Sequence, residues 1–121
     1  MSAEHIHFFL QLRDQIKLYH WQTRVYARHI ATDKTLGELE ERIDSFVEVY
    51  IGKYGRPRLT GKNAQLSLHN LTEAGATKMI KAAMKYVQNL HKPLQQHSDL
   101  LNILDDLQRE LGQLLYLFTL H

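Results

Sequence analysis

The sequence predicts an all-α fold, an antiparallel four-helix bundle that forms one domain over residues 1–121. Apolar residues recur at the helical period in four separate stretches, and no stretch shows the alternation typical of a β-strand. Apolar residues make up 44% of the chain and charged residues 23%, an ordinary composition for a globular domain with a real core. Four amphipathic helices of this size pack most simply as a bundle.

The first two helices are predicted over residues 3–22 and 26–53. The apolar face of the first holds His5, Ile6, Phe9, Leu12, Ile16, Tyr19 and His20. The stripe of the second consists of Leu36, Leu39, Ile43, Phe46, Val47, Tyr50 and Tyr54. No glycine or proline separates the two, but on one straight helix their stripes, centred on Ile16 and Ile43, would lie about 180° apart. We therefore expect a break near residues 23–25 and an antiparallel pair.

The third helix begins near Thr72, a good N-cap residue with Glu73 in the first turn. Its stripe consists of Ala76, Met79, Ile80, Ala83, Tyr86, Val87 and Leu90. The fourth helix begins after Ser98, again a good N-cap residue followed by Asp99. Its stripe consists of Leu100, Leu104, Leu107, Leu111, Leu114 and Phe118. We expect loops at residues 52–70, with no clear extra helix, and around residues 93–98.

Composition excludes several classes of function. Without cysteine, the chain has no disulfide, no thiol catalysis and no cysteine-based zinc or iron–sulfur site. The first residues lack the pattern of a signal peptide, and the longest uncharged apolar stretch, residues 111–120, is too short to span a bilayer. We therefore expect a cytoplasmic or other intracellular location and no membrane partner.

One flank of the second helix, next to its core stripe, gathers potential metal ligands. With Ile43 as zero, the directions from about +40° to about +140° hold His29, Asp33, Glu40, Asp44, Glu48 and Ile51. A matching flank of the first helix holds Leu10, Lys17 and Trp21. A solvated face has no need of the tryptophan, and a core would not tolerate unpaired acids. The mixture predicts a surface between subunits with a metal at it, formed by at least a twofold dimer through these two helices.

The spacing of the acids and histidines specifies candidate ligands. Asp44 and Glu48 are four residues apart, so both project from adjacent turns in one direction, and His29 and Asp33 have the same relation. His20 lies on the preceding helix and faces the core side. Carboxylates and imidazoles together suit divalent iron, manganese or zinc.

These residues resemble the signature of the Dps-type miniferritins within the ferritin-like superfamily. The resemblance rests on His20-Trp21, on His29 and Asp33, and on Asp44 and Glu48, and the last helix is loosely similar. It implies a ferritin-like bundle whose iron site lies between subunits, with His20, His29 and Asp33 from one chain facing Asp44 and Glu48 of its twofold mate. The chain also looks similar to small ferritin-like proteins of large DNA viruses through residues 19–21 and 52–55, which would place it in a host cell.

The resemblance implies that the protein oxidises Fe(II) with peroxide or dioxygen and so protects against oxidative damage. A ferroxidase-type enzyme activity is therefore favoured. Zinc or manganese are possible alternatives to iron. A ferritin site inside one bundle is less expected, because the third helix has no acid after Glu73 and Glu4 and Asp14 lie off the core stripe of the first. The alternative is a non-catalytic helical assembly or interaction protein on the same scaffold.

Individual residues also have simpler interpretations. His20 alone would be a hydrogen-bonded core histidine, and Asp44 and Glu48 would pair with Arg24, Arg28 or Arg42. Basic residues gather in the loop after the second helix (Lys53, Arg56, Arg58 and Lys62) and along the third (Lys78, Lys81 and Lys85). No groove-reading motif accompanies them and the formal charge is only +2, so we expect weak, salt-sensitive DNA binding or none.

Overall fold

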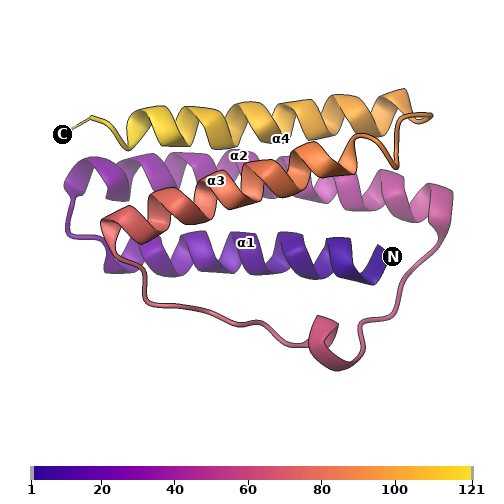
Figure 1. Cartoon of the computed structure of the whole chain (residues 1–121), viewed down its shortest axis with the longest axis horizontal. Coiled ribbons are helices and arrows are strands. Elements are labelled where there is room, and N and C mark those ends of the chain that lie inside the picture. Colours follow the sequence, from indigo (N-terminus) through magenta and orange to yellow (C-terminus); the bar gives the residue numbers. More distant parts are fainter. Residues whose placement is uncertain (1, 121) are drawn as a thin grey trace.

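The computed structural model describes residues 2–120, and the two end positions of the predicted domain lie outside the described residues. The chain forms four α-helices: α1 (Ser2–Gln22), α2 (Tyr26–Tyr54), α3 (Glu73–Leu90) and α4 (Ser98–Leu117) (Figure 1). One short 3-10 helix, η1 (Gly61–Ala64), interrupts the connection between α2 and α3. Residues 2–120 contain no β-strand, so the prediction of an all-helical chain with four helices is confirmed.

The helices lie side by side along a common direction (Figure 1). The connection from α2 to α3 runs back along the length of the molecule beside α1, so α2 and α3 run in the same direction (Figure 1). Helix α4 then returns antiparallel to both. The closest backbone packing joins α2 to α4, α1 to α2 and α3 to α4, whereas α1 and α3 are packed less closely.

The break between α1 and α2 falls where the phase of the two stripes requires it. Residues 23–25 are not helical. The Thr23 N–H donates to the Tyr19 carbonyl oxygen (2.8 Å), which closes the last turn of α1, and the Val25 N–H donates to the Thr23 hydroxyl (3.2 Å). The tight turn folds the two helices against each other and directs both stripes into one core.

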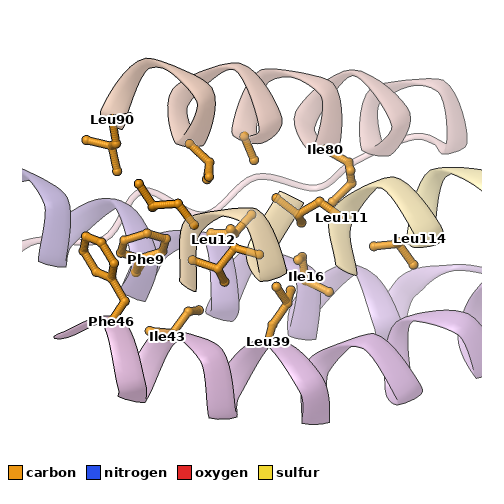
Figure 2. Close-up of a cluster of buried hydrophobic side chains, with 14 of the residues drawn as sticks. Phe9, Leu12, Ile16, Leu39, Ile43, Phe46, Ile80, Leu90, Leu111 and Leu114 are labelled. Atoms are coloured by element: carbon orange, nitrogen blue, oxygen red, sulfur yellow. The ribbon is translucent and has the colours of Figure 1, made fainter. Parts of the chain in front are cut away.

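The core is formed by side chains of all four helices that point into a shared interior (Figure 2). Leu39, Ile80 and Leu111 are fully buried, and each comes from a different helix. Burial of one such side chain contributes about 1.5–3 kcal/mol, so this interior supplies the main driving force for folding. Tyr54, which ends the α2 stripe, lies outside the core and is 41% exposed.

Two helix starts and one connection test the predicted boundaries. Thr72 is the N-cap of α3, and its side chain accepts a hydrogen bond from the Gly75 N–H (2.9 Å), as predicted. The predicted N-cap of α4, Ser98, is the first helical residue, and the N-cap is His97, whose side chain makes no capping hydrogen bond. In the first turn, the side chain of Asp99 accepts a hydrogen bond from the Leu100 N–H. The loop after α2 was expected to have no helix but contains η1.

In residues 2–120, no helix combines the length and apolar composition needed to cross a membrane.

Candidate functional site

His20 and His29 lie face to face at the end of the molecule where α1 turns into α2. Their rings stack with centroids 4.0 Å apart and planes 12° from parallel. Each Nδ1 is bonded to the backbone of the other residue: His20 Nδ1 to the His29 carbonyl oxygen and His29 Nδ1 to the His20 carbonyl oxygen, both at 2.9 Å. The tight turn at residues 23–25 makes this exchange possible.

The hydrogen bonds fix the tautomer of both rings. A carbonyl oxygen only accepts, so each Nδ1 must carry the hydrogen, and in the neutral ring the lone pair then lies on Nε2. Thr32 reinforces this at His20: its hydroxyl donates to the Arg28 carbonyl oxygen (2.8 Å) and accepts from His20 Nδ1 (2.9 Å). Neither Nε2 has a hydrogen-bond partner within residues 2–120. Histidine ligands of metals typically have this arrangement, with Nδ1–H held by a carbonyl oxygen and Nε2 available.

The carboxylates of Asp44 and Glu48 form a second group, farther along α2. Both are exposed and project from adjacent turns. A hydrogen bond with Asp44 and repulsion from its charge raise the pKa of Glu48. None of the three arginines considered as partners forms an ion pair with them: Arg42 pairs with Glu38 at 3.8 Å, Arg28 donates to Tyr19 and to the Glu73 backbone, and Arg24 forms no ion pair with a described residue. The pair therefore carries excess negative charge that a bound divalent cation would relieve.

Asp33 lies between the two groups. It is exposed and lines an open groove of about 410 Å³ between α1 and α2. Within this groove Arg13 pairs with Asp14 and Glu40, each at 3.3 Å. Asp33 makes no hydrogen bond with either histidine in the described structure, and its place on the flank of α2 is the one the spacing predicted.

The two ligand groups are well separated on one chain. His29 and Asp44 are 15 residues apart on one helix, which corresponds to about 22 Å along its axis. Within residues 2–120, no three histidine and acidic side chains come close enough to hold a metal together. The donor types fit a divalent transition metal. One copy of the chain does not bring the two groups together, so a metal held by both would require a second copy.

Apolar side chains surround the histidine half of the site on the outer surface. Trp21, Tyr26 and Ile30 are 67%, 76% and 49% exposed. Lys17 Nζ lies 5.3 Å from the centre of the Trp21 ring, and the Tyr26 ring lies beside that of His29. Leu10 and Ile51, expected to be exposed on this face, are half-buried.

Some relevant residues were missed by sequence reasoning. Thr32 is fully buried beside His20, and its signal was its place three residues after His29 on the inner side of α2. Gly37 is exposed on the same flank as Asp33 and Asp44, and no atom lies within 4 Å of where its Cβ would be. A Glu-x-x-His spacing, typical of ferritin sites, occurs at Glu4 and His7, but His7 Nε2 donates to the Gln65 carbonyl oxygen (2.7 Å).

The fold and these two groups of residues define an all-helical protein that presents histidines at one end of a helix pair and paired acids along it. The model of the DUF5856 family, a family of unknown function, matches residues 20–118, and the chain therefore belongs to this family. No curated protein and no solved structure matches the chain.

Proposed function

We propose that this protein is a miniferritin-like iron-binding protein that oxidises Fe(II) at a site between two subunits. The observation that carries the proposal is the reciprocal bonding of His20 and His29, which leaves the Nε2 atoms of the two neighbouring rings without a hydrogen-bond partner among residues 2–120; the His20 side chain is only 6% exposed and His29 is half-buried. In this proposal His20, His29 and Asp33 of one subunit and Asp44 and Glu48 of its mate hold the iron. Glu48 lies closest to the ion, because its longer arm reaches from the edge of the flank.

The topology supports a ferritin-like bundle. Helices α2 and α3 are parallel because the connection between them crosses the whole length of the molecule (Figure 1). One long crossover of this kind characterises ferritin-like folds among four-helix bundles. The simplest up-and-down bundle would have short connections throughout.

The positions of the half-sites support an isologous dimer. If two copies of α2 pack antiparallel, the stretch from His29 to Asp33 in one copy faces the stretch from Asp44 to Glu48 in the other. The twofold axis then crosses α2 midway between these stretches, near Gly37, where the absence of a side chain permits close approach. The exposed Trp21 and Ile30 would be covered in the same contact.

The chemistry required of the chain is modest. Imidazole and carboxylate ligands bind Fe(II) as the substrate, and the acids stabilise the higher charge of Fe(III) after oxidation. Two Fe(II) ions supply the two electrons that convert one peroxide to water, so no hydroxyl radical is released. In the dimer, water is displaced from the acid pair and the interaction of these charges with iron is strengthened.

The acid pair can be tested against a matched pair elsewhere. Asp44→Ala with Glu48→Ala should abolish Fe(II) oxidation and leave the helical content intact, because both side chains are exposed. Asp106→Ala with Glu110→Ala removes two acids at the same spacing on α4 and should leave oxidation unchanged. Wild-type oxidation by the first double variant would place the site elsewhere.

Subunit sharing is tested by co-expressing two defective chains, one carrying His29→Gln and the other both acid substitutions. Half of randomly formed dimers are mixed, and one of the two sites in each is intact, so activity should return to about a quarter of the wild-type rate. Sites contained within one chain would give no recovery. If the wild type neither binds nor oxidises Fe(II), the non-catalytic assembly function is favoured, which the exposed aromatic surface at Trp21 and Tyr26 would serve.

A further inference from the structure

A cavity of about 330 Å³ lies on the opposite side of α1 from the proposed iron site, between α1, α3 and the part of the α2–α3 connection that contains His69. Leu12, Met79 and Ala83 form its apolar floor, and all of its lining residues lack a formal charge when histidine is neutral. Its volume is at the lower end of the range of about 300–1,000 Å³ that is typical of small-molecule sites.

Both ends of the seam between α1 and α3 are fixed by specific contacts. At one end the Phe8 and Tyr86 rings stack with centroids 3.8 Å apart, and His5 Nδ1 and the Tyr86 hydroxyl are hydrogen-bonded at 2.7 Å. At the other end the Tyr19 hydroxyl donates to the Glu73 carboxylate (2.9 Å). Between these two ends the cavity is lined by small or flexible side chains such as Gln11, Met79 and Ala82, which leave the middle of the seam unfilled.

The third wall is a strand-like loop held to α1 by side chains. The Gln15 amide makes two hydrogen bonds to the backbone of His69, both at 2.8 Å, and Gln11 Oε1 accepts from the Ser67 N–H (3.0 Å). These bonds keep the loop in place over the rim of the cavity. The cavity is therefore largely formed before any ligand arrives, which lowers the cost of binding.

The unused polar groups of the cavity gather on this rim. Each Gln15 amide group already makes one bond, whereas the Gln11 NH₂ and the His69 imidazole have no partner within residues 2–120. Both can donate a hydrogen bond. Lys78 and Lys85 are exposed on the adjacent face of α3, and neither forms an ion pair with a described residue. The surroundings thus favour an oxygen acceptor, neutral or anionic, and disfavour a cation.

The geometry points to a binding site for a small amphiphile, an alkyl or aryl body that fills the cavity and ends in an oxygen acceptor at Gln11 and His69. A protein helix is too large for the available volume, since it is about 10 Å across with its side chains. An apolar body makes van der Waals contacts with the floor residues that the empty cavity does not provide, and these contacts favour binding.

The test uses 1-octanol, octanoate and octylammonium as probes and the methionine methyl groups as reporters in NMR spectra. Met79 lines the cavity, whereas the Met84 methyl group faces Gly112 of α4. Octanol and octanoate should shift the Met79 signal in a saturable manner and leave that of Met84 unchanged, and octylammonium should bind more weakly. Equal shifts at both methionines, or strongest binding of the cation, would overturn the inference.

A blocking variant provides the second arm. Ala82 lines the cavity but is exposed, so Ala82→Phe fills the opening without entering the core. Ala74→Phe, at an exposed alanine of the same helix outside the cavity, is the matched control. Binding of octanoate should weaken roughly tenfold or more in the first variant and stay at the wild-type level in the second. Undiminished binding by Ala82→Phe, with helical content preserved, would contradict the site.

Discussion

Gln15 and His69 are joined by two hydrogen bonds: the Gln15 NH₂ donates to the His69 carbonyl oxygen, and Gln15 Oε1 accepts from the His69 backbone N–H. The same relation recurs along α1, where Gln11 bonds Ser67 and His7 bonds Gln65. Four residues of helix advance about 6 Å and two residues of extended chain about 6.6 Å, so every fourth side chain of α1 meets every second residue of the loop. The crossover is thus fastened to the helix it passes.

Removing the most buried of these contacts should destabilise the protein. Gln15 is only 5% exposed, and Gln15→Ala leaves both backbone groups of His69 without their partners. We expect the free energy of unfolding, measured with urea, to fall by about 1–3 kcal/mol. Gln11→Ala removes one exposed bond and should cost less than about 1 kcal/mol. Equal effects of the two variants would show that the burial of Gln15 is unimportant.

The proposed dimer axis near Gly37 predicts that one substitution raises the stability of the isolated chain and weakens dimerisation. Gly37 is exposed within α2, so Gly37→Gln should stabilise the isolated chain by about 0.5–1 kcal/mol through helix propensity. The same side chain would enter the space needed by the partner helix and should weaken dimerisation. Thermal unfolding and sedimentation equilibrium measure the two effects.

Gly52→Gln is the control for Gly37→Gln. Gly52 is also exposed on α2 with open space around it, but it lies 15 residues from Gly37, about 22 Å along the helix from the proposed axis. It should raise helix stability in a similar way and weaken dimerisation much less than Gly37→Gln does. A dimer that tolerates Gly37→Gln would exclude the proposed axis, and a wild type that is strictly monomeric at high concentration would exclude the shared site.

The helices and the first turn could be predicted because they follow from local periodicity. The phase difference between Ile16 and Ile43 located the turn at residues 23–25 without any glycine or proline to mark it. The exact start of α4 was missed by one residue, since Ser98 and His97 differ little in sequence context and the choice depends on the preceding turn. Local signals determine that a helix exists better than where it ends.

The candidate site was predictable in composition but not in arrangement. The spacing placed Asp44 and Glu48 on one flank, as the structure has them. The reciprocal bonds between His20 and His29 involve backbone carbonyl oxygens, which every residue has, so no sequence pattern reports them. The attachment of the crossover to Gln15 is hidden for the same reason: its partner is the backbone of a residue 54 positions away.

The N-cap of α3 offers a test of a local stabilising contact. The Thr72 hydroxyl accepts from the Gly75 N–H, which would otherwise lack a helical partner. Thr72→Ala should lower the free energy of unfolding by about 1 kcal/mol, and Thr72→Ser, which retains the hydroxyl, should restore most of it. Chemical denaturation of the three proteins decides the matter, and a serine variant as unstable as the alanine variant would show that the methyl group of threonine matters instead.

A final prediction concerns pH. His91 is the C-cap residue of α3 and lies against α4: its Nε2 is 2.8 Å from the Asp105 carboxylate, and its Nδ1 faces the carbonyl oxygens of Val87 and Gln88. Burial of the ring lowers the pKa of His91. The hydrogen bond with Asp105 and those with the two carbonyl groups raise the pKa by a larger amount, so the net pKa lies above the ordinary value. Both nitrogens face acceptors, which favours the protonated ring.

The raised pKa sets the sign of the pH dependence. Because the folded protein binds this proton more tightly than the unfolded chain, the stabilisation is complete below the unfolded pKa of about 6.5 and is lost as the pH rises through the raised value. The Asp105 side chain is 63% exposed, so solvent screens the pair and we expect less than about 1 kcal/mol. Asp105→Asn removes the charge and should flatten this part of the urea-stability profile. Burial lowers the pKa of His5, with the opposite sign, but His5 is common to both proteins and cancels in their difference. A difference that grows as the pH rises above 6.5 would contradict this role for His91.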